Sequence, residues 1–151
     1  MLSTLAGGSD KASAMVTIAA GAHAGSYLVR SADTPCAITE QVPPRPRHQF
    51  EVSIGGPAAS MDPKQLTQLT MIIPSADVRG PNHSFFASIT FGDIARGARY
   101  VAEMRPGEKM GGGGTVTVLP RGEDATLTFD VTSADGTSYT GVIQCVGVVH
   151  I

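Results

Sequence analysis

The stretch ATLTFDVTSADGTSYTGVIQC, residues Ala125–Cys145, decides the fold. Apolar and polar residues alternate on both sides of the pair Asp135-Gly136. An Asp-Gly pair between two alternating runs is the strongest short-range signal for a β-hairpin. Because successive side chains of a strand point to opposite faces, each run has one apolar face. The residues on those two faces are Leu127, Phe129 and Val131, and Tyr139, Ile143 and Cys145.

Similar short runs recur along the whole chain, separated by Gly and Pro. The predicted strands span 15–19, 26–30, 36–39, 49–54, 66–73, 84–91, 99–103, 115–119, 125–132 and 138–149. Many short strands at regular spacing are typical of an all-β protein. We therefore predict an antiparallel β-sandwich, immunoglobulin-like or related. One short helix is possible at SMDPKQL, where Asp62 is a candidate cap and Pro63 a candidate first residue.

Composition limits the classes of protein to which the chain can belong. Its 151 residues fit one domain, and 42% of them are hydrophobic. The formal net charge of −2 argues against general nucleic-acid binding, which needs a basic face. No apolar run approaches the roughly 18–20 residues of a membrane span. Met15 and Met71 lie in strand patterns, so we expect both in the core.

The two cysteines, Cys36 and Cys145, lie near opposite ends of the predicted sheet region. There is no C-x-x-C pair, and no His stands at metal-ligand spacing from either cysteine. We predict one disulfide between them, with two buried free thiols as the alternative. A disulfide implies an oxidising compartment.

The N-terminal residues LSTLAGGSDKASA resemble the junction at which bacterial lipoproteins are processed. Leu5, Ala6 and Gly7 match the junction, and Gly8 stands where the lipidated cysteine would be. The charged region and most of the apolar region of a signal peptide are missing. The alternative is an unstructured tail whose likeness is accidental. In either case we expect residues 1–14 to form a tail or tether that adds nothing to the core, followed by a sandwich domain over 15–151.

The layout of the chain also resembles small secreted bacterial lipoprotein domains. The segments VTIAAGAHAGSYLV, FEVSIGG and LTQLTMIIPSAD, the early Cys36 and the ending that closes with Cys145 are similar to the LpqH family of mycobacterial lipoprotein antigens. The resemblance covers most of residues 16–145 and includes no diagnostic motif. It implies a β-sandwich lipoprotein architecture and nothing catalytic.

Several groups of residues are candidate sites, and none favours chemistry over a structural role. The glycine-rich loop Gly107–Val118 contains Lys109 before its glycines, whereas a phosphate-binding loop has the lysine after them. The proline-rich stretch Pro43–Phe50 is interpreted as a stiff linker, with a polyproline II ligand as the alternative. Glu123 and Asp124 lie in a predicted turn and are expected to be solvated.

The histidines and an arginine pair complete the candidates. The four histidines are His23, His48, His83 and His150. No two of them have the spacing of a metal-binding motif. Arg96 and Arg99 lie near Asp93 in DIARGARY, where a solvated loop is favoured over an anion site. The sequence therefore predicts no catalytic residue, no cofactor and no metal.

The expected function follows from the fold and the compartment. We expect a non-enzymatic bacterial domain in the periplasm, cell envelope or medium, which binds an unknown protein or surface ligand. It would be monomeric, would not bind nucleic acid, and would reach a membrane only through a lipid anchor that this chain lacks. The alternative is a structural subunit of a fibre, pilus or capsid decoration that assembles by strand addition. An extracellular hydrolase ranks third.

Overall fold

A computed structural model of the protein describes residues 10–40, 48–55, 62–74, 80–107 and 111–151. Within these residues the secondary structure is entirely β, with 64% in strands and no helix. The strands form two six-stranded sheets that pack face to face. The expected all-β sandwich is thereby confirmed.

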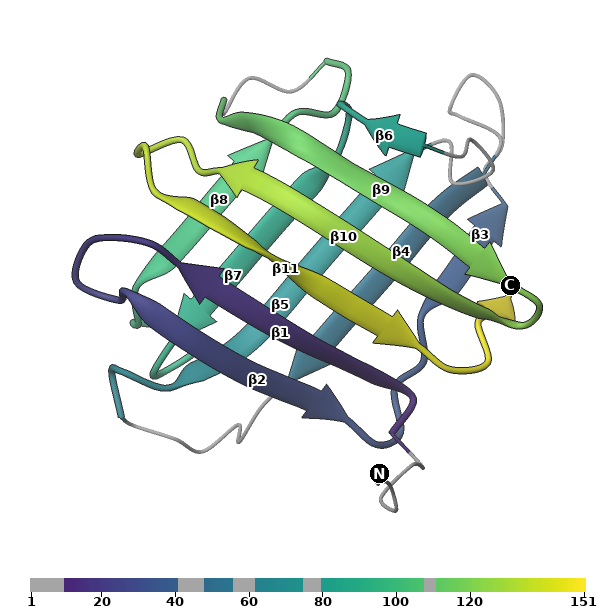
Figure 1. Ribbon diagram of the computed structural model, residues 1–151, viewed down its shortest axis with the longest axis horizontal. Helices are drawn as coiled ribbons and strands as arrows, with labels where there is room; N and C mark the ends of the chain where they lie inside the picture. Colours follow the sequence, from purple (N-terminus) through teal and green to yellow (C-terminus); the bar gives the residue numbers. More distant parts are fainter. Residues whose placement is uncertain (1–9, 41–47, 56–61, 75–79, 108–110) are drawn as a thin grey trace.

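The sheet nearer the viewer in Figure 1 is called the front sheet. Its strand order is β2-β1-β11-β10-β9-β6, and every pairing is antiparallel. The bounds are β1 Ala12–Ile18, β2 Gly25–Ser31, β6 Gly80–Asn82, β9 Gly113–Arg121, β10 Asp124–Thr132 and β11 Ser138–Cys145.

The back sheet has the order β12-β3-β4-β5-β7-β8. The bounds are β3 Ala37–Glu40, β4 His48–Gly55, β5 Leu66–Pro74, β7 Phe86–Phe91, β8 Arg99–Glu103 and β12 Val149–His150. An antiparallel meander is formed by the strands β3, β4, β5, β7 and β8, in that order. The last strand, β12, pairs with β3 in parallel. Within the sandwich class this connectivity differs from the immunoglobulin order, which distributes successive strands between the sheets.

The core lies between the two sheets, whose strands cross one another in Figure 1. Alternation along each strand places every second side chain in this core, as in β10, where the buried residues are Ala125, Leu127, Phe129 and Val131. The inward faces predicted around Asp135-Gly136 are confirmed, because all six residues are at most 4% exposed. Met71 is buried as expected, but the expectation for Met15 is wrong, since it is 48% exposed.

The predicted hairpin between β10 and β11 is confirmed. Ser133 N donates to Thr137 O over 2.8 Å, and Thr137 N donates to the Asp135 carboxylate over 3.1 Å. Gly136 has a φ of 92°, a left-handed conformation that glycine adopts without strain. The Asp-Gly pair therefore fixes the register of the two strands.

Two strand predictions need correction. The run predicted over 138–149 is two strands, because β11 ends at Cys145 and the chain then crosses to the back sheet as β12. The crossing includes Gly147 with a φ of 69°, which interrupts an extended strand. The short β6 was not predicted, because a three-residue Gly-Pro-Asn segment has turn chemistry and no alternation.

The possible helix at SMDPKQL is not found in its described part. Residues 63–65 form a turn in which Asp62 Oδ1 accepts from Lys64 N over 2.9 Å. β5 begins directly afterwards at Leu66. The alternating pattern that follows therefore decides the local structure, and one capping residue does not extend into a helix.

The expected boundary at residue 14 is too late. β1 begins at Ala12, and the side chains of Ala12 and Ala14 are each 1% exposed. Ala12 lies opposite Cys145 and Ala14 opposite Ile143 in the pairing with β11. Alanine carries a weak hydrophobic signal, but it fits an inward position where larger neighbours fill the space. Residues 1–9 of the expected tail lie outside the described residues.

Candidate functional site

A pocket of about 360 Å³ opens between the two sheets at one end of the sandwich. It is lined by Ile38, Phe50, Val118, Pro120, Gly122, Glu123, Asp124, Ala125, Val148 and His150. Its volume lies near the lower end of the range of about 300–1,000 Å³ for small-molecule sites. The lining residues come from both sheets and from segments far apart in sequence.

The walls of the pocket are apolar and come from inward strand positions. Val118 on β9 and Ala125 on β10 are at most 4% exposed. Across the sandwich, Ile38 on β3 lies directly opposite Phe50 on β4, and the Phe50 side chain is 1% exposed. The period-2 pattern of these strands therefore creates the walls, because it turns alternate side chains toward the gap between the sheets.

One side of the pocket is closed by the last six residues, 146–151, which we call the C-terminal strap. Val148 N donates to Glu123 O over 2.7 Å, and Gly147 N donates to Asp124 Oδ1 over 2.9 Å. On the other side, Val149 N donates to Cys36 O over 3.0 Å. The strap thus connects the β9–β10 turn of the front sheet to β3 of the back sheet.

The strap leaves the front sheet beside the disulfide. Cys36 and Cys145 are bonded, as predicted, with Cα atoms 5.8 Å apart. Both side chains are at most 1% exposed. The bond links the residue before β3 to the last residue of β11, and so ties together the two sheets that form the pocket. The alternative of two free thiols is wrong.

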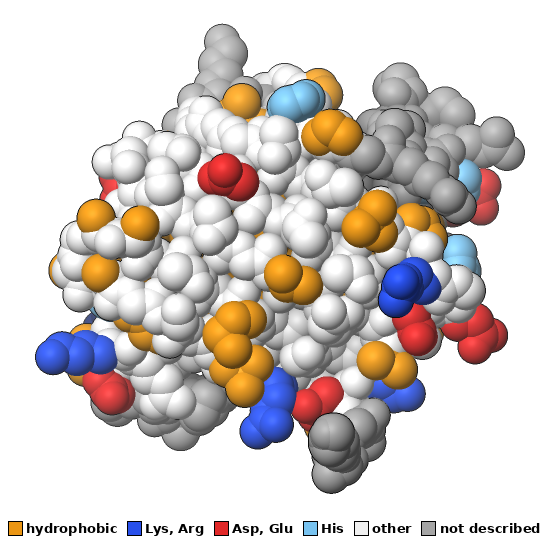
Figure 2. Space-filling view, viewed as in Figure 1, with side chains coloured by type: hydrophobic (Ala, Val, Ile, Leu, Met, Phe, Trp, Pro, Cys, Tyr) orange, Lys and Arg blue, Asp and Glu red, His pale blue; other side chains and the backbone are white. Residues whose placement is uncertain are grey.

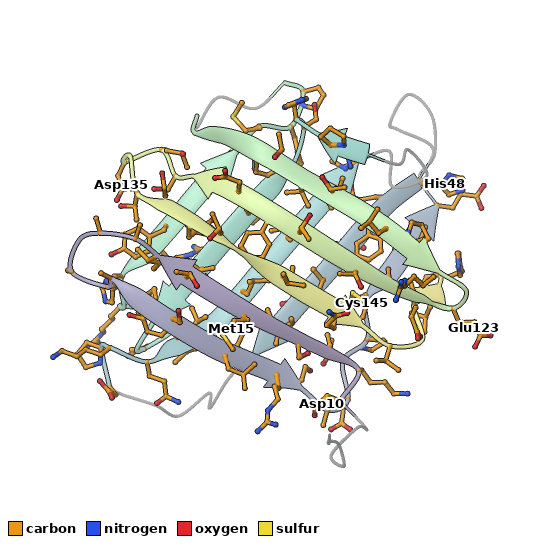
Figure 3. The ribbon with its side chains drawn as sticks, viewed as in Figure 1. Asp10, Met15, His48, Glu123, Asp135 and Cys145 are labelled. Atoms are coloured by element: carbon orange, nitrogen blue, oxygen red, sulfur yellow. A yellow bond between two sulfur atoms is a disulfide. The ribbon has the colours of Figure 1, made fainter. Side chains whose placement is uncertain are left out.

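The mouth of the pocket is polar and carries acidic groups. Glu123, Asp124 and His150 are all exposed, and the set of lining residues contains no Lys or Arg. Figure 3 shows Glu123 at the end of the molecule opposite Asp135. The predicted turn is confirmed at Gly122, with a φ of 61°, and at Glu123, whereas Asp124 is already the first residue of β10. The two carboxylates are exposed as expected, but the sequence did not indicate that they border a pocket.

The four histidines do not converge on one site. His150 lines the pocket, whereas His23 lies in a separate aromatic cluster, where its ring stacks on Phe91 with centroids 4.2 Å apart. His23 Nε2 lies 3.0 Å from Pro63 O and donates to it, because a carbonyl oxygen only accepts. Nδ1 is then the acceptor for the Tyr100 hydroxyl, 2.6 Å away, when the ring is neutral. His48 begins β4, and His83 follows β6. In the described part of the chain, no three His, Cys, Asp or Glu side chains are grouped to hold a metal ion.

The remaining candidates are separate from the pocket or only partly described. Lys109 and residues 43–47 lie outside the described residues. Asp93 caps a turn by accepting from Ala95 N over 2.8 Å. Arg99 donates to Ser88 Oγ over 3.3 Å. Phe50, the last residue of the proline-rich stretch, contributes to the pocket wall.

A buried ion pair was missed by the sequence analysis. The Glu103 side chain is 3% exposed, and its Oε1 atom accepts from Arg105 Nε over 2.6 Å. The Arg105 guanidinium also lies 5.1 Å from the centroid of the Phe86 ring. The pair lies on β8 and directly after it, away from the pocket. We assign it to folding, because a buried carboxylate needs a partner.

Three titratable groups near the β10–β11 hairpin have shifted pKa values. Hydrogen bonds from the Ser133 hydroxyl and from Thr137 N lower the pKa of Asp135. Burial, and secondarily the negative charge of Asp135, raise the pKa values of Tyr139 and Tyr100. The hydrogen bonds that lower the pKa of Asp135 stabilise the turn when its carboxylate is charged, and none of the three groups belongs to the pocket.

Comparison with protein-family models, with curated proteins and with solved structures found no match to this chain. In the part of the chain that the structure describes, no helix is long and apolar enough to cross a membrane. The pocket and its chemistry are therefore the features of this chain that bear on function.

Proposed function

We propose that this chain is a non-enzymatic, extracytoplasmic binding domain that holds a small amphiphile in the pocket between its sheets. The observation that carries the proposal is the pocket itself, about 360 Å³ in volume, with apolar walls and a polar mouth. Small-molecule sites have this character, with mostly hydrophobic lining and a few polar groups that fix orientation.

The charge of the mouth defines the class of head group. Glu123 and Asp124 are the acidic residues of the lining, which contains no Lys or Arg. A ligand with a cationic head would place that head beside the carboxylates and its alkyl chain between Val118 and Phe50. An anionic head of equal size would be repelled at the same position.

The lining chemistry favours binding over catalysis. The ten lining residues include no Ser, Thr, Cys, Tyr or Lys, so their reactive side chains are those of Glu123, Asp124 and His150. One of the two carboxylates, Asp124, already accepts a hydrogen bond that holds the strap. The residues therefore suit recognition of a ligand more than covalent chemistry on it.

The cellular location is a separate part of the proposal. The disulfide is consistent with an oxidising compartment. Placement at a bacterial envelope through a lipid anchor is inferred only from the resemblance of the N-terminal residues to a lipoprotein junction. Mass spectrometry of the natural protein tests this point by detecting lipid, or its absence, on the N-terminus.

The binding proposal is tested by methyl-detected NMR during titration with decyltrimethylammonium below its micelle-forming concentration. We expect shifts confined to Ile38, Val118 and Val148. Ala125→Leu fills the pocket and should abolish these shifts. Thr126→Leu adds the same side chain to the outer face of the same strand and should leave them unchanged. Absent shifts, or shifts that survive in Ala125→Leu while its melting curve stays cooperative, would contradict the proposal.

A further inference from the structure

The two sheets have four edge strands, and three of them are short or covered. β6 has three residues, including Pro81, and β12 has two. Val101 O on β8 accepts from Ala134 N over 2.8 Å, and Glu103 forms a bridge with Gly111. Natural proteins protect sheet edges with such devices, because unpaired backbone groups attract another strand.

The fourth edge, β2, lacks these devices. It has seven residues, GSYLVRS, with neither Pro nor Lys, and β1 is its only partner among the described strands. Its single charged residue, Arg30, lies 3.8 Å from the Asp10 carboxylate. Figure 1 shows β2 as the outermost strand of the front sheet. A seven-residue edge with one charged residue and no proline is a template for strand pairing.

An exposed apolar row runs across the front sheet to this edge. Leu28 lies directly opposite Met15, and Met15 lies directly opposite Val142. The three side chains are 53%, 48% and 36% exposed, so exposure increases toward β2. Figure 2 shows hydrophobic side chains gathered on this face, and Figure 3 places Met15 on it.

We propose that two copies of this chain pair through β2, antiparallel and edge to edge, about a two-fold axis at Leu28. The front sheets of the two copies then form one continuous sheet. The interaction is independent of the pocket, which lies between the sheets and is lined by none of the residues of β2.

The register about Leu28 satisfies the requirements of an antiparallel pair. Leu28 is the central residue of β2, so this register pairs all seven residues and sets Leu28 against its own copy. Inward residues oppose inward residues, because Tyr27 meets Val29. Arg30 meets Ser26, so no like charges oppose each other. The exposed row then continues across the axis, with three apolar side chains from each copy.

The pairing closes on itself. A two-fold interface uses the same surface of both copies and leaves no second copy of that surface free. Because the other three edges formed by the described strands are short or covered, edge pairing ends at a dimer and does not continue into a filament. The proposal therefore replaces the monomer expected from sequence and disfavours a fibre built by edge pairing.

The test is sedimentation equilibrium of the full chain over a range of concentrations. We expect a monomer–dimer equilibrium for the unmodified protein. Leu28→Lys and Leu28→Glu each set like charges face to face and should weaken the dimer by at least about tenfold. Leu119→Lys is the matched control, because Leu119 is 48% exposed on the same face but lies on β9. It should dimerise like the unmodified protein.

Mixing the two charge variants tests the symmetry directly. If residue 28 faces its own copy, Leu28→Lys and Leu28→Glu mixed in equal amounts should form a heterodimer, detected by native mass spectrometry through their different masses. A strictly monomeric unmodified protein would overturn the proposal. So would higher oligomers, dimers unaffected by either charge variant, or a mixture that stays monomeric.

Discussion

Removing the disulfide should cost this protein a large part of its stability. The perturbation is the double variant Cys36→Ala and Cys145→Ala, with alanine chosen because both sites are buried and a serine hydroxyl would lack a partner there. The bond joins residues separated by 109 positions. In the chain-entropy model, closing a loop of that length stabilises the folded state by about 4.8 kcal/mol at 25 °C.

That magnitude is large against a typical unfolding free energy of about 5–15 kcal/mol. The assay is urea unfolding at equilibrium, followed by far-ultraviolet circular dichroism and by fluorescence of the three tyrosines. With a slope of about 2 kcal/mol per molar urea, the midpoint should fall by about 2.4 M. Each single variant, measured under reducing conditions, should lose about as much as the double variant, since either change removes the same bond.

Two results would refute this reasoning. A loss below about 1 kcal/mol would mean that the reduced, unfolded chain is already as restricted as the bridged one. Single losses that add to give the double loss would mean that the two thiols act through local packing and not through a shared bond.

Three further perturbations follow from the structure. Gly141→Ala places a Cβ 2.1 Å from a backbone oxygen and should lower the unfolding free energy by about 3 kcal/mol in urea titrations, whereas Gly113→Ala, with open space around it, should change it by under about 0.5. Arg105→Ala leaves the buried Glu103 carboxylate without its ion-pair partner and should lower the unfolding free energy by about 3 kcal/mol. This is the low end for buried pairs, because the Arg105 side chain is 31% exposed. Adding Glu103→Gln should restore most of the lost stability. Asp135 has a lowered pKa in the folded state, so its contribution to the free energy of unfolding is complete above the unfolded pKa of about 3.9 and is lost as the pH falls through the folded pKa. The difference in Tm between the unmodified protein and Asp135→Asn should therefore vanish below the folded pKa. A difference that stays constant with pH would contradict the assignment.

Local patterns predicted most of the framework. The Asp135-Gly136 pair carries turn chemistry and lies between two alternating runs, so the hairpin and its inward faces followed directly. The pairing of Cys36 with Cys145 followed from their number and their apolar surroundings. These features depend on neighbours in sequence or on a pairing with one possible partner.

The errors of the sequence-based prediction arose where tertiary contacts determine the structure. Met15 has the alternation of a strand, but alternation alone does not say which of the two faces is buried. Ala12 and Ala14 proved to be the inward residues of that strand, although their hydrophobic signal is weak. The split after Cys145 depends on the crossing to the back sheet, which no local pattern indicates.

The pocket could not be predicted from sequence for the same reason. Its walls combine Ile38, Val118 and Val148, which are brought together by the strap and by the packing of the sheets. The sequence placed Glu123 and Asp124 in the turn between β9 and β10, and Asp124 proved to be the first residue of β10. Their place at the mouth of a pocket depends on the C-terminal strap, which is held there by hydrogen bonds to Glu123 and Asp124.

The most direct test of the binding function is the charge preference of the pocket, measured by isothermal titration calorimetry with decyltrimethylammonium and decyl sulfate. The unmodified protein should prefer the cation. Glu123→Lys should shift the preference toward the anion, because the exchanged charge lies at the pocket mouth, whereas Asp130→Lys, the same exchange on the outer face of the front sheet, should leave the preference unchanged. Equal binding of both amphiphiles by the unmodified protein, or the same shift in both variants, would contradict a cation-selective pocket.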